Sequence, residues 1–376
     1  MPHVVVYSAM EPCSSWAHDI NTIKMADGFA KQGCRVSLVT RHGIDDCKTW
    51  TQIRDAYGLH PDITWVPVAY RTWGLNFDRY LHHRFSRHAS KTIIKLKPDL
   101  LYARDNFAPV YCSAAGIPSA VESHASVGTV GKPFDFIVDG SNHAEFRAWV
   151  TISSHLADYY HSQGVPKERL IVLPDSVDME LFGREHAAST ESPFVSGDRK
   201  KILYAGHLYD YKGIPTVLQA AQKLTDYDFH FIGGWPEDVQ RHQSYVTEQN
   251  LSNVYFHGLK PFAEVPRYLW HADLLLLPPS RNHPSAKWTS PVKLGEYMAS
   301  GTPVVASDIP ALLDWVDDSQ VWFFNADDAD LLCQSIQSVL QNPAGIKPKI
   351  DAAFQFAETL TYSRRAGQVL EFALGS

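Results

Sequence analysis

The chain has 376 residues, more than one hydrophobic core usually organises, so two domains are expected. Its formal net charge of -7 at pH 7 excludes a broadly basic nucleic-acid-binding protein, and we expect no nucleic-acid partner. Five cysteines without a C-x-x-C pair indicate neither a disulfide framework nor a zinc site.

The sequence also lacks the patterns of a membrane span and of a signal peptide. No apolar run reaches the about 18 residues that cross a bilayer. An apolar run starts at Val4, without the basic stretch that opens a signal peptide. We therefore expect a cytoplasmic protein and leave contact with a membrane surface open.

Short runs rich in β-branched residues alternate with helical patterns in the first half of the chain. The runs with strand character are 4–7, 35–39, 63–68, 100–102, 119–122, 148–152 and 170–173. Helix-length segments such as 19–32 and 89–96 lie between them. Continuous apolar strands separated by helices predict a parallel sheet that is covered on both faces.

The same alternation starts again after a polar segment, 183–199, which we interpret as a linker. The second set of predicted strands is 201–204, 228–232, 254–256, 274–277, 303–306 and 321–324. The fold class is therefore α/β, with two facing Rossmann-like, doubly wound domains at 1–182 and 200–359. A ligand is expected in the interdomain cleft, at the carboxyl ends of both sheets. The last helix, about 360–376, is expected to pack back on the first domain.

A glycine-bracketed loop between the first strand and first helix of the second domain is the first candidate site. Gly206 and Gly213 allow close backbone approach, and the following helix start at Ile214 offers free N–H groups to an anion. Lys212 adds a positive charge and His207 a second donor. These residues predict a diphosphate site, with a solvated loop lysine as the alternative.

A second candidate site opens a later helix. Ser290 and Pro291 suit a helix start, and Glu296 follows about two turns in. A carboxylate that accepts two hydrogen bonds suits the vicinal hydroxyls of a ribose. An exposed helix glutamate is the alternative, and Lys293 is either a donor contact or a structural lysine. Diphosphate and ribose together point to a nucleotide sugar.

These segments resemble the retaining glycosyltransferases of family 4, which have the GT-B fold. Their second domain usually opens G-R-L-x-x-x-K-G, and here the sequence is Gly206-His-Leu-Tyr-Asp-Tyr-Lys-Gly213, with His207 in place of arginine. The second glutamate of their E-x(7)-E pattern corresponds to Glu296. Trp288 stands at the position of the first glutamate. The variant S-P-x-K-L-x-E-Y-M-A-x-G matches from Ser290 to Gly301.

The resemblance implies an enzyme of polysaccharide or glycoconjugate biosynthesis. It would move a hexose from a UDP- or GDP-linked donor to a hydroxyl of a glycan, glycolipid or small-molecule acceptor. A front-face reaction with retention would need no cofactor and no metal. The implied catalytic residues are His124, Lys212 and Glu296. The implied donor site is Gly206, His207, Lys212, Gly234, Leu259, Lys260, Ser290, Pro291, Val292, Lys293 and Glu296. The implied acceptor site is Ser14, Ser15, Trp16, His18 and Arg104.

Other interpretations stay open at this point. His124 by itself is also compatible with a packing role. The segment 70–97 mixes basic and aromatic residues, which suits either a solvated helix or a membrane-surface patch near a lipid-linked acceptor. Trp288 and His207 favour a noncatalytic GT-B protein as the alternative function, and a GT-B epimerase is a further one.

Overall fold

The computed structural model describes residues 1–10, 12, 17–42, 49–69, 79–124, 132–195, 197–290 and 292–375. The chain divides into two compact units. The first is Met1–Ser176 with Thr361–Ser376, and the second is Val177–Leu360.

The first unit is built on a parallel sheet. Its strands are β1 (His3–Ser8), β2 (Arg35–His42), β3 (Thr64–Ala69), β4 (Leu100–Ala103), β5 (Ser119–Ser123), β6 (Phe146–Thr151) and β7 (Leu170–Val172). In the described residues the sheet has seven strands in the order β3-β2-β1-β4-β5-β6-β7. Every residue of β1 and β4 is buried, as the continuous apolar runs predict for strands covered on both faces.

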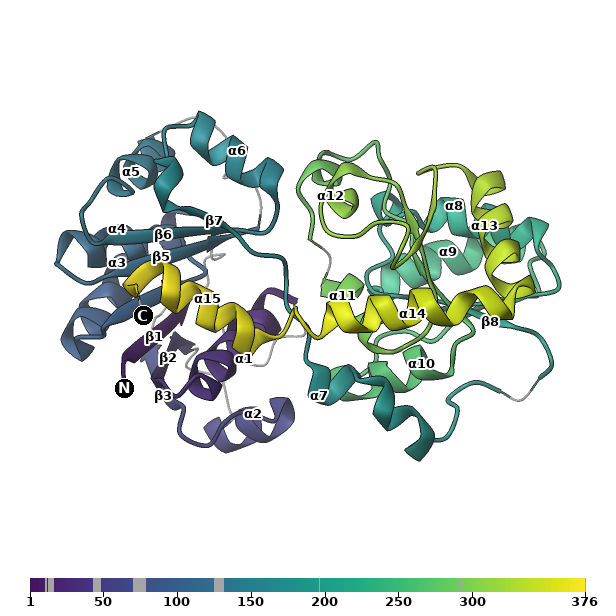
Figure 1. Ribbon diagram of the computed structural model, residues 1–376, viewed down its shortest axis with the longest axis horizontal. Helices are drawn as coiled ribbons and strands as arrows, with labels where there is room; N and C mark the ends of the chain where they lie inside the picture. The colour runs from purple at the N-terminus through teal and green to yellow at the C-terminus, as the bar shows by residue number, and fades with distance from the viewer. Residues whose placement is uncertain are drawn as a thin grey trace. The chain divides into compact units, whose positions relative to one another are not determined.

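Helices pack on this sheet, and the last one comes from the carboxyl end of the chain. They are α1 (Ala17–Lys31), α2 (Trp50–Tyr57), α3 (Arg79–Leu96), α4 (Ala108–Ala114), α5 (Lys132–Gly140), α6 (Ser154–Ser162) and α15 (Tyr362–Leu374). Helix α15, yellow in Figure 1, lies beside α1. The two are so close that a Cβ atom at Gly28 would lie 2.4 Å from the Tyr362 carbonyl oxygen.

The second unit repeats the architecture. Its strands are β8 (Lys201–Ala205), β9 (Asp228–Ile232), β10 (Val254–Phe256), β11 (Leu274–Leu277), β12 (Val304–Ser307) and β13 (Trp322–Phe324). Its α-helices are α7 (Met179–Phe182), α8 (Ile214–Lys223), α9 (Pro236–Glu248), α10 (Val265–His271), α11 (Val292–Ala299), α12 (Pro310–Leu313), α13 (Ala329–Gln341) and α14 (Pro343–Ala357). Within the described residues the six strands are parallel, in the order β10-β9-β8-β11-β12-β13.

The chain passes between the units at Ser176 and again at Leu360. Residues 183–199, which the sequence suggested as a linker, belong to the second unit. Phe182 and Phe194, on either side of a short 3-10 helix, are buried in its core. Among the described residues, no helix combines the length and the apolar character that crossing a membrane requires.

Both sheets reverse their strand order beside their first strand. The reversal lies between β1 and β4 in the first unit and between β8 and β11 in the second. In open α/β sheets, ligands bind outside the carboxyl ends of the strands at such a point. The two-domain α/β architecture predicted from the sequence is confirmed, and ligands are expected at these two sets of strand ends.

Candidate functional site

The glycine loop of the second unit joins the end of β8 to α8. Gly213 has φ of 82°, and a Cβ atom there would lie 1.7 Å from the Pro278 carbonyl oxygen, just after β11. Gly206 has φ of 137°, and a Cβ atom there would lie 2.1 Å from Lys293 Nζ. Both glycines are therefore needed for conformation and for close approach. Gly206 makes room for a lysine ammonium group at the carboxyl end of the central strand.

Two half-buried lysines meet at this loop. Lys293 Nζ donates a hydrogen bond to Tyr204 Oη at 3.0 Å and lies 4.5 Å from the Tyr204 ring centroid. Burial and the charge of Lys212 lower the pKa of Lys293 to about 7, while Glu296 acts in the opposite direction. Burial also lowers the pKa of Lys212. Neither lysine forms an ion pair with a described carboxylate, so the site carries positive charge that an anionic ligand would compensate.

His207 lies in an aromatic cluster beside these lysines. Its ring stacks on Tyr209 at 5.3 Å and on Trp235 at 5.4 Å between centroids. Trp235 Nε1 donates to Tyr209 Oη at 3.1 Å. Burial and the charges of Lys293 and Lys212 lower the pKa of His207, which makes it a neutral ring at pH 7. Lys293 is therefore the second group at the loop that can carry a positive charge, and it is fully charged only below its pKa of about 7.

A hydrogen bond connects helix α11 to the end of β8. The Tyr297 hydroxyl oxygen accepts a hydrogen bond from the backbone N–H of Ala205 at 2.8 Å. The same helix carries Lys293 and the half-buried Glu296, so both lie at the carboxyl end of β8. Ser290 precedes the helix and is buried. Pro291 lies outside the described residues.

The loops after β9 and β10 adjoin the glycine loop. A Cβ atom at Gly233 would lie 2.5 Å from the Gly206 carbonyl oxygen, and one at Gly234 would lie 2.6 Å from Leu208 Cδ1. Gly233 N–H donates to the Gly258 carbonyl oxygen at 2.8 Å, which joins the two loops. The neighbouring Leu259 is 49% exposed. Lys260 Nζ lies 5.7 Å from the Tyr268 ring centroid.

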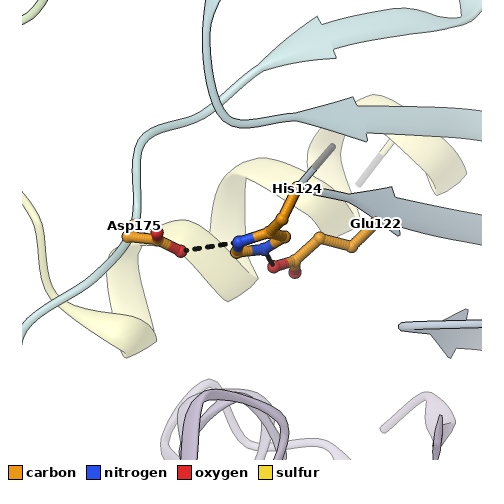
Figure 2. A group of neighbouring side chains, drawn as sticks. All are labelled: Glu122, His124 and Asp175. Atoms are coloured by element: carbon orange, nitrogen blue, oxygen red, sulfur yellow. Dashed lines mark hydrogen bonds and ion pairs between the residues drawn. The ribbon is translucent and has the colours of Figure 1, made fainter. Parts of the chain in front are cut away.

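The first unit holds a histidine between two buried carboxylates (Figure 2). Glu122 and His124 come from the end of β5, and Asp175 follows β7. Nε2 of His124 contacts Oε1 of Glu122, and Nδ1 lies 3.5 Å from Oδ1 of Asp175. The side chains of Glu122 and Asp175 are 1% and 3% exposed, and that of His124 is 18% exposed. His124 is therefore the most exposed of the three side chains.

The ionisation of this cluster follows from burial and from nearby arginines. Burial and the charges of Arg104 and Arg365 lower the pKa of His124 to about 3, although Asp175 acts in the opposite direction. Burial raises the pKa of Glu122, against the lowering effect of the Arg365 charge. At pH 7 the imidazole is therefore neutral.

Ligand atoms of Glu122, His124 and Asp175 lie within 4.8 Å of one another, a spacing that a cation could bridge. Arg365 Nη2 already lies 3.4 Å from Glu122 Oε1. Asn21 Nδ2 donates to Asp175 Oδ1 at 2.9 Å. Because the chain itself provides these donors, the arrangement favours an internally neutralised cluster.

Two of the predicted acceptor residues lie beside this cluster. Arg104 Nη1 donates to the His18 carbonyl oxygen at 3.1 Å, and His18 Nε2 forms a hydrogen bond with Ser8 Oγ at 3.0 Å. Burial, and after it the charge of Arg104, lower the pKa of His18 to about 3. The start of α1 and the ends of β4 and β5 thus bring His18, Arg104 and His124 together. Ser14, Ser15 and Trp16 lie outside the described residues.

Sequence reasoning did not assign several residues of these two clusters. Glu122 had a local signal, because residues two apart on a strand share a face and His124 was already a candidate. Asp175, Arg365, Tyr204 and Tyr297 had none, since only the folded chain places them beside the site.

Comparison with known proteins identifies the family. The family model described as Glycosyltransferase Family 4 matches residues 22–181, and the one described as Glycosyl transferases group 1 matches residues 199–342. The chain belongs to this glycosyltransferase family, as the motifs at Gly206 and Ser290 indicated.

Two curated proteins illustrate the relationship. The putative colanic acid biosynthesis glycosyltransferase WcaL of Escherichia coli is 28% identical over 50% of this chain and 47% of its own length. The amylovoran biosynthesis glycosyltransferase AmsK of Erwinia amylovora is 26% identical over 56% of this chain and 52% of its own length. The chain thus spans about half the length of these relatives.

A solved structure extends the likeness to the whole fold. Anabaena Alr3699/HepE in complex with UDP superposes with a TM-score of 0.72, at 14% identity over 99% of both chains. Together with the two doubly wound sheets, this assigns the GT-B fold.

Proposed function

We propose that this protein is a retaining glycosyltransferase that moves a hexose from a nucleoside diphosphate sugar to an acceptor hydroxyl, without a metal ion. The observation that carries the proposal is the pair Lys212 and Lys293, two partly buried lysines at the end of β8 that form no ion pair with a described carboxylate. The diphosphate of a UDP- or GDP-linked donor would supply the missing negative charge. The complex of HepE with UDP supports a nucleotide at this fold.

The proposed reaction needs charge stabilisation more than acid–base chemistry. The bond between the sugar C1 and the phosphate oxygen breaks, and the acceptor oxygen bonds to C1 from the same face. The acceptor proton passes to a phosphate oxygen. Lys212 and Lys293 stabilise the charge that develops on the departing diphosphate. His124 positions the sugar.

Other residues near the lysines would hold the rest of the nucleotide. Glu296 suits the ribose hydroxyls, since its carboxylate accepts two hydrogen bonds. The joined loops at Gly233 and Gly258 leave Leu259 exposed, which suits contact with a base. A panel of nucleotide sugars would identify the base and the sugar of the donor.

Calorimetric titration with UDP and GDP tests the proposal. We expect wild-type protein to bind one of them, and Lys212→Ala to bind it at least tenfold more weakly, about the loss of a charged hydrogen bond. Lys223→Ala is the matched control, because Lys223 lies exposed on α8 and pairs with Asp330 at 2.6 Å. Failure of wild type to bind either nucleotide would refute the proposal.

Trp288 favours one alternative, a GT-B protein that binds a sugar nucleotide without turning it over. This half-buried residue follows a short 3-10 helix and stands where the family pattern has a glutamate. Nucleotide binding by wild type, with no release of nucleoside diphosphate from any sugar donor in the presence of acceptor extracts, would support this alternative.

We further propose a cytoplasmic location with peripheral contact to a membrane that carries the acceptor. Helix α3 has no acidic residue, and Arg87, Lys91 and Lys95 are exposed along it. Such a stripe attracts anionic lipid. Retention on anionic vesicles should decrease at high salt and in the triple glutamate variant of these positions. Equal retention by the variant would exclude this surface.

A further inference from the structure

The last helix of the chain contributes a buried arginine to the histidine cluster of the first unit. Arg365 on α15 is 3% exposed. Its Nη1 donates to the carbonyl oxygens of Leu173, at 2.8 Å, and Pro174. Its Nη2 lies 3.4 Å from Glu122 Oε1. Backbone acceptors therefore hold the guanidinium in place beside Glu122, independently of the ionisation of that carboxyl group.

The charge of Arg365 favours the carboxylate form of Glu122, whose pKa burial raises. Its side chain is 1% exposed, and Oε2 has no hydrogen-bond partner among the described residues. A buried carboxylate is costly unless a cation or donors compensate it. In the described residues, the other titratable groups that act on Glu122 or His124 include His18 on α1, Arg104 after β4 and Asp175 after β7. Of the two arginines, only Arg365 lies within ion-pair distance of Glu122 in the described residues.

The contacts of the His124 imidazole bear on which of its two nitrogens carries the proton. A neutral histidine carries one N–H and one lone pair, and the partner of one nitrogen decides which form is present. Nε2 of His124 contacts Glu122 Oε1, whereas Nδ1 lies 3.5 Å from an Asp175 oxygen that already accepts from Asn21. We propose that Arg365 is a positioning residue for His124: it keeps Glu122 as the carboxylate and so holds the ring as the tautomer protonated at Nε2.

Loss of the arginine charge should reverse this arrangement with the uptake of one proton. The proton on Nε2 transfers to Glu122, which becomes a carboxyl group that donates back to Nε2. A solvent proton then bonds to Nδ1 and is donated towards Asp175. The ring then presents an N–H group at Nδ1, where the wild-type protein presents a lone pair.

Nitrogen-15 NMR of histidine side chains tests the inference directly. The His124 signals are assigned by their absence in His124→Gln, which is necessary because the chain has 18 histidines. We expect the Nε2–H pattern in wild type and in Arg365→Lys, and the Nδ1–H pattern in Arg365→Met. Arg364→Met is the matched control, since Arg364 is exposed on the same helix. An Nδ1–H pattern in wild type would overturn the inference even if Arg365→Met fails to fold.

The chemical consequence rests on the proposed function, in which His124 contacts the donor sugar. In Arg365→Met we expect kcat to fall about 10- to 100-fold, as for a misplaced catalytic group, with little change in the KM for the donor. Arg365→Lys should recover most of kcat. If wild type binds no nucleotide, the proposed function fails while the tautomer result stands. If the tautomer and kcat of Arg365→Met match wild type, the inference fails and the proposed function stands.

Discussion

The charge on Lys293 leads to the sharpest prediction, which concerns donor affinity and its pH dependence. Burial and Lys212 lower the pKa of Lys293 from 10.5 to about 7. At about 1.4 kcal/mol per pKa unit, the empty site disfavours the charged lysine by about 5 kcal/mol. A bound diphosphate offsets part of this cost, so the pKa of Lys293 rises in the complex.

The sign of the pH dependence follows. Affinity for UDP or GDP is full below pH 7, where Lys293 is already charged, and is lost as pH rises above it. Each pH unit above this point requires about 1.4 kcal/mol to protonate the lysine, so affinity should fall about tenfold per unit between pH 7.5 and 9. Calorimetric titration in buffers of different ionisation enthalpy would also measure the proton taken up.

Two substitutions test whether Lys293 carries this effect. Lys293→Met keeps the length of the stem, removes a charged hydrogen bond of about 1.5–3 kcal/mol, and should weaken binding about 10- to 100-fold at pH 7. Adding His207→Arg supplies a guanidinium that stays charged at every pH used. The double variant should therefore regain affinity without regaining the pH dependence. Unchanged affinity and an unchanged pH profile in Lys293→Met would refute the reasoning.

Three further predictions concern the packing, the backbone conformation and the stability of the two units. Gly28→Ala should lower the free energy of unfolding in urea by about 1–3 kcal/mol, because its Cβ would meet the Tyr362 carbonyl oxygen at 2.4 Å. Gly367→Ala, whose Cβ would meet only the Gln32 side chain at 3.4 Å, should stay near wild type. Gly213→Ala should weaken UDP binding as well as lower Tm, whereas Gly116→Ala, with φ of 83° but open space, should lower Tm alone. Burial and the charge of His257 lower the pKa of His230 to about 3, so stability should be full above pH 6.5 and decrease as pH falls. His230→Phe should flatten this decrease in the urea midpoint, and an equal decrease would contradict the assignment.

Much of the fold was predictable because its signals are local. Each strand of both sheets overlaps a predicted apolar run. The signal is clearest in β1, β4 and β11, in which every residue is buried, as expected of parallel strands covered on both faces. The glycine loop and the start of α11 were also predictable from short segments, because glycine, serine and lysine at fixed spacing indicate where the backbone can approach an anion. The family followed from these same segments.

The electrostatic character of the sites was decided by tertiary structure. His207 was a candidate donor in sequence, but the folded chain stacks it on Tyr209 and Trp235 and places two lysines near it, which makes it neutral. The sequence left Lys293 as either a donor contact or a structural or solvent-facing lysine, and the folded chain places its ammonium group against Gly206. Ionisation depends on burial and on charges brought from other strands and helices, and no window of sequence contains them. Arg365 shows this most clearly, because a residue of the last helix lies beside Glu122 only after the chain has returned to the first unit.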